Sequence, residues 1–366
     1  MFVRVRQGYF TTTFLVAAVC LAIAACGGSN PVEGAPGSTA PAKAVGTSGA
    51  DAPLTGDVTV DGSSTVMPVS KVMAETFQQA NQGVRVSVQE SGTGGGFKKL
   101  CAGELDIAGA SRPINDVEGH QCLTNRIEYM ELPIAFDALS VVVNAANDFA
   151  SCLTVDELRK MWAPAAAGQV KRWNQIRSSF PDKPITLFGP GTASGTFDYF
   201  TLAVVGTQRS SRMDYTKSED DAVLVKGVED DQNALGYFGY AYYLANKDKL
   251  KLVSIDSGKG CVVPSADTVA DGTYQPLSRP IFIYVNRKAA ARPEVNAFTR
   301  FYIAPESARY VHDVGYVPLP PVTLLSVAKR LDKSTTGSIF GGRGSVLGVT
   351  AETFQDEDKI KSALVR

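Results

Sequence analysis

The sequence predicts an α/β protein of two lobes, and three observations lead to this prediction. First, residues 57–111 alternate between β-branched runs and amphipathic runs in the order strand, helix, strand, helix, strand. Second, about 310 residues follow the low-complexity N-terminal segment, which is too many for one simple core. Third, residues 127–144, "IEYMELPIAFDALSVVVN", have the β-branched density of long strands, and a long strand pair can carry a chain from one lobe to another.

The first 25 residues predict export from the cytoplasm. Arg4 and Arg6 precede a short apolar run that ends in "IAAC", which resembles the signal of bacterial lipoproteins. We therefore expect residues 1–25 to be a signal peptide, Cys26 to carry lipid, and the protein to be anchored to the cell membrane on its extracytoplasmic side. An ordinary cleaved signal or a retained anchor is the alternative. Residues 26–55 are rich in Gly, Ser, Pro and Ala and predict a disordered tether.

The charge balance argues against a nucleic-acid partner. The whole chain has 36 basic and 37 acidic residues and a formal net charge of −1. Removal of the signal peptide takes away two arginines and no acid, so the mature chain carries about three net negative charges. No stripe of basic and aromatic residues follows in the remaining sequence.

The elements can be placed in order along the chain. After the strand "VTV", apolar residues recur at helical spacing from Val69 to Ala80, and Pro68 is tolerated there because it lies in the first turn. The strand "VRVSVQES", a glycine turn, a helix around "FKKLCAGE" and the strand "LDIAGAS" complete the pattern. Thr154 and Glu157 have capping-box spacing at the start of a later helix, and the strand "ITLFGP" precedes a helix from about Gly195 to Val205.

These elements suggest a division into two lobes and an extension. We expect lobe I to comprise residues 57–140 and 276–323, and lobe II to comprise residues 141–275. Residues 324–366 form a C-terminal extension with one amphipathic segment, and the sequence does not indicate how it packs.

Four cysteines remain after the signal peptide and the lipidation site, and an even number in an oxidising compartment predicts disulfides. Three pairings are possible. We favour Cys101–Cys122 and Cys152–Cys261, because each pair then joins segments of one lobe. A zinc site is the alternative, but the sequence has no CxxC and only His120 lies close to a cysteine. We therefore expect no metal.

Four turns share a composition that suits the binding of an anion. They are "DGSSTV" at 61–66, "SGTGGGF" at 91–97, "GASRP" at 109–113 and "TASGTF" at 192–197. Three of them precede a predicted helix, whose first N–H groups lack internal acceptors and carry partial positive charge. Glycine permits close approach to a ligand, and Ser and Thr hydroxyls add donors. Open α/β sheets bind ligands at such strand–helix borders.

Each turn taken alone has a simpler interpretation. Ser-Gly-Thr before a helix is most often an ordinary N-cap, and a glycine run can be a flexible loop. Other phosphate motifs do not fit, because the sequence lacks GxxxxGK[ST] and the glycine run does not complete GxGxxG. The combination of four turns, rather than any one of them, favours an anion site.

The ordered set of motifs resembles the phosphate-binding lipoproteins of bacterial ABC transporters. "DGSSTVMP", "SGTGGGF", "DIAGASRPI", "AFDALSVVVN", "ASGTF" and "GYVPLP" occur in the order of that family over residues 57–320. The resemblance implies a two-lobed periplasmic-binding-protein fold of class II, with the ligand held between the lobes. It implies capture of inorganic phosphate and its delivery to an ATP-driven membrane permease, with no catalysis and no cofactor. We expect a monomer.

Position by position, the resemblance implies contacts to phosphate from all four turns. The implied residues are Ser64, Thr65, Val66 (through its backbone N–H), Ser91, Thr93, Ser111, Arg112, Ser194, Gly195 and Thr196.

The charged groups of this site depart from the family pattern. Some members have aspartate where Arg112 stands and an arginine ahead of the Ser-Gly-Thr turn, where this chain has "GPGTA". We therefore expect Arg112 to be the one arginine of the site and to bind phosphate through two hydrogen bonds. A buried carboxylate would accept the proton of phosphate and repel sulfate, and Asp137 is the first candidate, with Asp61 second. A hinge or surface role for Asp137 is the alternative.

Three other functions remain open at this stage. A binding protein for another oxyanion, such as sulfate or molybdate, would use the same backbone donors. A phosphate-ester hydrolase is less well supported, because His120 and His312 have no evident partner and "TASGT" is not a GxSxG motif. A lipoprotein that serves adhesion or sensing could use the same scaffold.

Overall fold

The computed structural model describes residues 53–355. The predicted signal peptide, Cys26 and nearly all of the predicted tether lie outside the described residues. No helix within residues 53–355 is long and apolar enough to cross a membrane.

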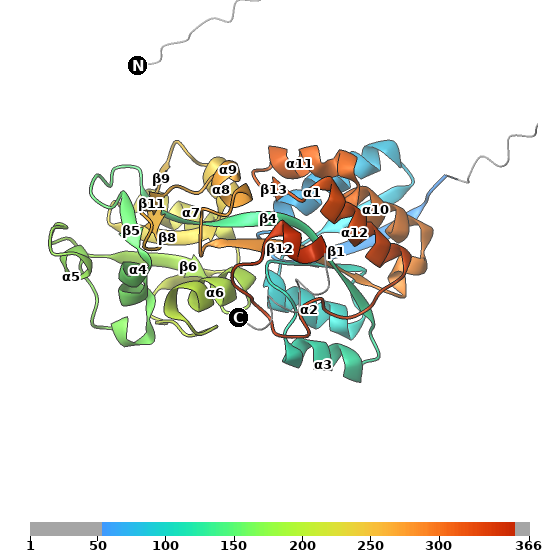
Figure 1. Cartoon of the computed structure of the whole chain (residues 1–366), viewed down its shortest axis with the longest axis horizontal. Helices are drawn as coiled ribbons and strands as arrows, with labels where there is room; N and C mark the ends of the chain where they lie inside the picture. The colour runs from blue at the N-terminus through green and yellow to red at the C-terminus, as the bar shows by residue number, and fades with distance from the viewer. Residues whose placement is uncertain (1–52, 356–366) are drawn as a thin grey trace, which may run out of the picture. The chain divides into compact units, whose positions relative to one another are not determined.

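A ten-stranded mixed sheet runs through the molecule and connects two lobes (Figure 1). Its main path is β2 (Val84–Val88), β1 (Gly56–Gly62), β3 (Ile107–Ala110), β12 (Ser278–Asn286), β4 (Tyr129–Asn144), β8 (Ala234–Gly239), β6 (Thr186–Pro190) and β7 (Thr216–Ser218). Two further strands, β9 (Leu250–Leu252) and β13 (Val317–Pro318), also pair with β4. The elements coloured blue to teal and orange to red form lobe I, and those coloured green and yellow form lobe II.

Strand β4 is the element that joins the lobes. Residues Tyr129 to Ala138 pair antiparallel with β12 in lobe I, whereas Leu139 to Val143 pair antiparallel with β8 in lobe II. All 16 residues of β4 are buried, because the strand is covered on both faces along its whole length. Neighbouring strands are parallel in β2–β1–β3 and in β8–β6–β7, while β4 and β12 run antiparallel to their neighbours.

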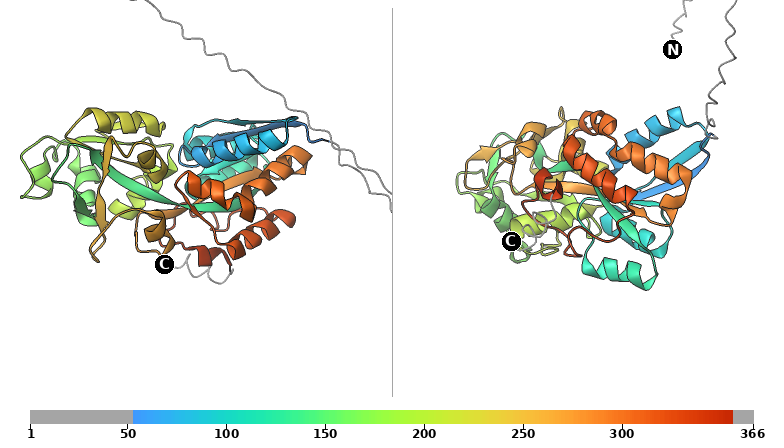
Figure 2. Two further views of the ribbon diagram at one scale, coloured as in Figure 1. Left: turned by 90° about the horizontal axis from the view of Figure 1, so that it is seen from above. Right: turned by 45° about the vertical axis from the view of Figure 1, so that its right-hand side comes forward.

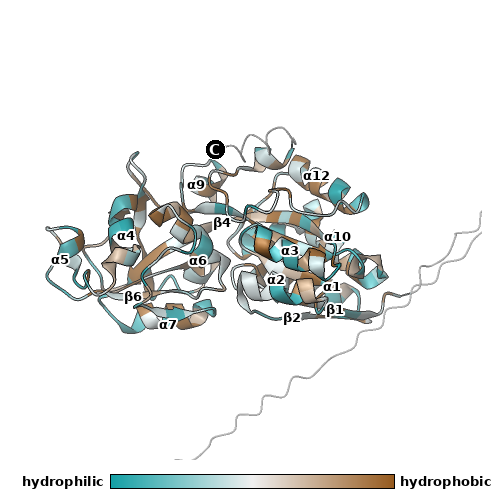
Figure 3. Cartoon of the chain, turned by 90° about the horizontal axis from the view of Figure 1, so that it is seen from below, coloured by the Kyte–Doolittle hydropathy of each residue, from teal (hydrophilic) through white to brown (hydrophobic). Residues whose placement is uncertain are grey.

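Helices pack around both halves of this sheet (Figure 2). Lobe I has α1 (Met67–Ala80), α2 (Gly92–Ala102), α3 (Asp116–Thr124), α10 (Pro293–Ile303), α11 (Ala308–Asp313) and α12 (Pro321–Asp332). Lobe II has α4 (Val155–Trp162), α5 (Trp173–Ile176), α6 (Gly195–Phe200), α7 (Asp221–Asp230), α8 (Tyr240–Leu244) and α9 (Ala266–Ala270). Apolar residues are frequent in the inner strands, whereas the helices carry polar and apolar residues together (Figure 3).

Helix α2 begins earlier than the sequence suggested. The glycine run 92–96, expected as a turn, forms the first turns of the helix. A Cβ on Gly96 would lie 2.7 Å from the Cα of Gly62, so glycine at this position lets α2 pack directly against the end of β1. This close packing offsets the low helix propensity of glycine.

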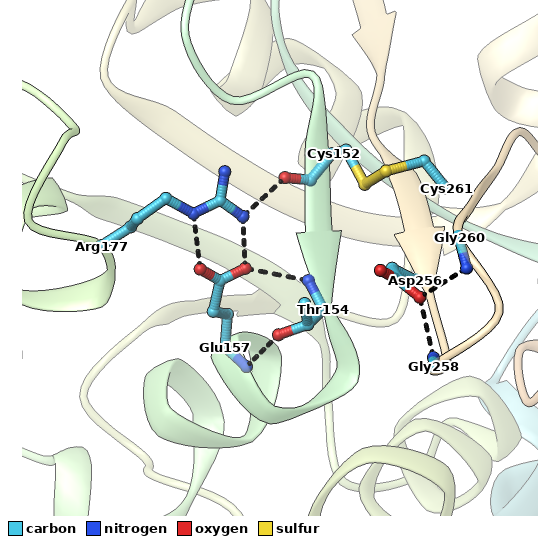
Figure 4. Close-up of a disulfide and its surroundings, with 8 residues drawn as sticks. All are labelled: Cys152, Thr154, Glu157, Arg177, Asp256, Gly258, Gly260 and Cys261. Atoms are coloured by element: carbon cyan, nitrogen blue, oxygen red, sulfur yellow. Dashed lines mark hydrogen bonds and ion pairs between the residues drawn. A yellow bond between two sulfur atoms is a disulfide. The ribbon is translucent and has the colours of Figure 1, made fainter.

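The structure contains the two favoured disulfides, one within each lobe. Cys101–Cys122 joins α2 to α3. Cys152–Cys261 joins β5 (Cys152–Thr154) to β11 (Cys261–Val262) in a three-stranded sheet completed by β10 (Ser254–Asp256). Next to this disulfide, the predicted capping box of α4 is present, and Arg177 binds both carboxylate oxygens of Glu157 at 2.7 Å (Figure 4).

Residues 324–355 of the C-terminal extension, which the sequence left unplaced, pack against lobe I. Arg330 on α12 donates to the carbonyl of Glu131 on β4 at 3.0 Å, and the N–H of Ile339 donates to the Glu131 carboxylate at 2.8 Å. Phe340 is fully buried, with its ring centroid 6.0 Å from those of Phe282 and Phe354. The extension therefore completes the core of lobe I.

We predict that Phe340→Ala destabilises the protein by about 3–5 kcal/mol, because it opens a cavity in a buried aromatic cluster. Leu347→Ala in the same extension is the control, since Leu347 is partly exposed. Urea unfolding of both variants measures the difference. Equal, small effects would contradict the assignment of the extension to the core.

Candidate functional site

The four predicted turns meet between the lobes. The Thr65 and Thr196 hydroxyl oxygens, from lobes I and II, are 3.0 Å apart. The Thr93 and Ser111 hydroxyl oxygens are 3.1 Å apart. A Cβ on Gly195 would lie 2.6 Å from the Thr93 Oγ1 and 2.5 Å from the Ser111 Oγ, so this glycine lies directly against both hydroxyls. All five residues are buried.

Arg279, a residue that the sequence analysis missed, is at the centre of this arrangement. It lies on β12 in lobe I and is fully buried. One terminal nitrogen donates to the Thr196 hydroxyl at 2.7 Å and to the Thr65 hydroxyl at 3.2 Å, and the other donates to the carbonyl of Gly195 at 3.0 Å. A second arginine, which the expectation of a single site arginine did not include, therefore lies among the groups that the turns bring together.

Asp137 is the counter-ion of Arg279. Its Oδ2 is 3.0 Å from the Arg279 Nη2 and 3.2 Å from its Nε, and both side chains are completely buried. The two residues face each other across β4 and β12, next to the point where β4 changes lobes. The second oxygen, Oδ1, makes no hydrogen bond of ordinary geometry within residues 53–355, although the backbone N–H of Tyr240 is close enough to the carboxylate to lower its pKa. Burial raises the pKa of Asp137 to about 6, against the opposing effect of Arg279.

Arg112 lies beside the site and is engaged by two carboxylates. Its terminal nitrogens donate to both oxygens of Glu118 at 2.7 Å, and its Nε donates to Asp198 on α6 at 2.6 Å. Burial lowers the pKa of Arg112, but the Glu118 and Asp198 carboxylates outweigh this effect and raise it. In this structure both terminal nitrogens of the guanidinium donate to Glu118. The role of Arg112 in ligand binding stays a prediction.

Other predicted groups have partners within the protein. The Val66 N–H donates to the carbonyl of Ser63 at 3.1 Å, and the Ser91 hydroxyl donates to Asp61 at 2.9 Å. The Ser194 hydroxyl accepts from the N–H of Thr196 at 3.0 Å and caps α6. The buried Ser64 accepts at its carbonyl from the Tyr242 hydroxyl at 3.1 Å.

Asp61, the second candidate for the proton-accepting acid, is committed elsewhere. It pairs with Lys99 and accepts from the hydroxyl of Ser91 and from the N–H of Gly62. Of the two candidates, Asp137 is the one that pairs with Arg279, whose guanidinium contacts the Thr65 and Thr196 hydroxyls.

The lobes are in direct contact across this site. Besides the contacts of Arg279 and Arg112, the N–H of Gly94 at the start of α2 donates to the carbonyl of Ala193 in lobe II at 2.9 Å. Separation of the lobes would break these contacts.

Among residues 53–355, no cluster of three or more His, Cys, Asp or Glu side chains could hold a metal ion. A two-lobed fold with polar groups from both lobes at one buried point is that of a class II periplasmic binding protein.

Comparisons with known proteins place the chain in a family. Residues 38–306 match the family model described as a PBP superfamily domain. Protein SphX from Synechocystis is 49% identical over 294 residues, which cover 80% of this chain and 87% of the relative. Phosphate-binding protein PstS from Staphylococcus haemolyticus is 38% identical over 282 residues, or 76% of this chain and 86% of the relative.

A solved structure agrees with these relatives. The crystal structure of a possible phosphate binding protein from Planctomyces limnophilus is 46% identical, with a TM-score of 0.57 over 77% of this chain and 99% of that chain. The chain belongs to the PBP superfamily and, within it, to the family that contains these SphX and PstS proteins.

Proposed function

We propose that this chain is an extracytoplasmic solute-binding protein that captures inorganic phosphate between its lobes and delivers it to the permease of an ABC transporter. A 38% identical relative is named a phosphate-binding protein, which supports both the ligand and a binding role without turnover. The observation that carries the proposal is the convergence of four hydroxyls from both lobes. Those of Thr93 and Ser111 lie against Gly195, and those of Thr65 and Thr196 contact the buried Arg279.

The proposed contacts follow from this convergence. We place the phosphate oxygens among the four hydroxyls, next to Gly195, where backbone and side-chain donors are available without bulk. Arg279 supplies positive charge beside them. The remaining predicted contacts would require these groups to exchange their present partners for the ligand; they come from Ser64, Val66, Ser91, Arg112 and Ser194.

Asp137 is the proposed determinant of selectivity. Its Oδ1 is buried and makes no hydrogen bond of ordinary geometry within the described residues. Phosphate carries at least one proton near neutral pH and can donate it to this oxygen, whereas sulfate has no proton to donate and would be repelled. Rejection of sulfate distinguishes this proposal from a general oxyanion-binding protein, which uses the same hydroxyls.

Ligand binding would favour the closed arrangement of the lobes. Donors of the site come from lobe I at Thr65, Thr93 and Ser111 and from lobe II at Gly195 and Thr196. A ligand gains all of these contacts only when the lobes are together, so its binding energy shifts the equilibrium toward closure.

We also propose that Cys26 is lipidated after cleavage of residues 1–25 and that residues 26–55 tether a monomeric binding protein to the cell membrane. The support is the lipoprotein-like pattern that ends in "IAAC" and the low apolar content of the following segment. A membrane anchor would keep the binding protein close to its permease.

A calorimetric titration of the protein from about residue 56 onward tests the ligand. We expect phosphate to bind with one site per chain and sulfate at equal concentration not to compete.

Asp137→Asn should weaken the rejection of sulfate by about tenfold or more, because a repelling charge is lost and Arg279 is left without its counter-ion. Unchanged selectivity in this variant would show that Asp137 does not determine the rejection of sulfate. Equal binding of both anions by the wild-type protein would favour a general oxyanion-binding protein.

Gly195→Ala tests the position of the ligand. The added methyl group would press against the Thr93 and Ser111 hydroxyls, so we expect phosphate affinity to fall about 10- to 100-fold. Gly119→Ala in α3 is the matched control, because its Cβ would meet the protein at an ordinary distance of 3.6 Å. Full phosphate affinity in Gly195→Ala would place the ligand elsewhere.

A further inference from the structure

Asp221 is a buried acid whose environment the proposed function does not yet explain. It is the first residue of α7 in lobe II, and only 1% of its surface is exposed. Neither carboxylate oxygen forms a hydrogen bond of ordinary geometry within residues 53–355, and the Ser64 hydroxyl is the one side-chain donor close enough to lower the pKa of Asp221 by hydrogen bonding. An ionised carboxylate in such a position is costly, whereas a neutral carboxylic acid is not.

The charged neighbours of Asp221 also disfavour its ionised form. Burial is the main cause that raises the pKa of Asp221 to about 8, and the acids Glu90 and Asp137 raise it further. The Ser64 hydroxyl and Arg279 act in the opposite direction with smaller effects.

The charged neighbours of Asp221 come from several segments of the chain. Glu90 follows β2, Asp137 lies on β4 and Arg279 lies on β12. Tyr242 and Tyr316 also interact electrostatically with Asp221. The neighbouring Glu90 is influenced in turn by Asp220, Lys71, Asp61 and Glu219.

The position of Asp221 connects it to the proposed ligand site. Its side chain lies close enough to the Ser64 hydroxyl to be influenced by it, and Ser64 belongs to the first of the four turns. The two tyrosines beside it hold the same turn, because Tyr242 donates to the carbonyl of Ser64 and Tyr316 donates to the carbonyl of Thr65. Asp137 is connected to the same turn through Arg279, which donates both to Asp137 and to the Thr65 hydroxyl. Each of the two acids has at least one carboxylate oxygen without a hydrogen bond of ordinary geometry within residues 53–355.

We propose that Asp221 is a second carboxyl group of the phosphate site, which is held as the neutral acid and donates a hydrogen bond to the bound anion. This inference rests on the proposed function. A neutral carboxylic acid has one donor and can face an unprotonated phosphate oxygen, while the ionised Asp137 accepts from a protonated one. The pair of acids then matches a partly protonated tetrahedral anion, and ionisation of Asp221 weakens its binding.

The dependence of phosphate affinity on pH tests the inference. We would titrate the wild-type protein, Asp221→Asn and Asp220→Asn with inorganic phosphate by calorimetry between pH 6.5 and pH 9.5. The Asp221→Asn variant keeps a hydrogen-bond donor at this position and cannot ionise. Asp220→Asn is the matched control, because Asp220 is the exposed N-cap of α7 and asparagine caps helices equally well. The protonation of free phosphate changes with pH in the same way in all three experiments, so it cancels when the affinities of the three proteins are compared.

From pH 7 to pH 9, we expect the wild-type protein and Asp220→Asn to lose about tenfold more affinity than Asp221→Asn, because an acid with a pKa near 8 is mostly ionised at pH 9. Parallel curves for all three proteins would overturn the inference and leave the proposed function intact. Failure of the wild-type protein to bind phosphate at any of these pH values would instead overturn the proposed function, and the inference with it.

A second measurement does not depend on the folding of a variant. The infrared absorption of protonated carboxyl groups in the wild-type protein should contain a component that disappears between pH 7 and pH 9.5. Saturating phosphate should move this loss to higher pH, because a ligand that binds the protonated form stabilises it. A component that phosphate does not shift, or its absence at pH 7, would contradict the inference.

Discussion

The buried pair of Arg279 and Asp137 is the interaction on which the arrangement of the site depends. A guanidinium without water must have its N–H groups satisfied by the protein. Arg279 meets this requirement with Asp137, with two threonine hydroxyls and with the carbonyl of Gly195. Because these acceptors come from both lobes, the same charge that fixes the strands of lobe I also positions the opening turn of α6 in lobe II.

The position of this pair follows from the pairing of two strands. Arg279 and Asp137 are directly opposite in the antiparallel register of β12 and β4, and β4 exchanges lobe I for lobe II from Leu139 onward. The charged pair is therefore located where the chain passes between the lobes. A ligand that contacts hydroxyls on both sides of this point would couple its binding to closure of the lobes. In this way a set of mainly uncharged donors can hold an anion and change the conformation of the protein when the anion binds.

Local sequence was sufficient for the parts of the site that depend on local structure. The turns with Thr65, Thr93 and Thr196 were predicted because Gly, Ser and Thr at strand–helix borders leave a recognisable composition. Arg279 was missed because it stands in "SRPIFIYVN", which has the pattern of a buried strand, and its partner is 142 residues away. An arginine within an apolar strand was itself a signal that could have been followed. The C-terminal extension could not be placed, since its contacts depend on surfaces formed by distant segments.

A crystal structure of the protein with bound phosphate tests the central claim most directly. We predict electron density for one phosphate ion between the lobes, with its oxygens within hydrogen-bond distance of the Thr65, Thr93, Ser111 and Thr196 hydroxyls and close to Arg279. Phosphate found at another place, or a cleft that stays without it at saturating concentration, would contradict the account.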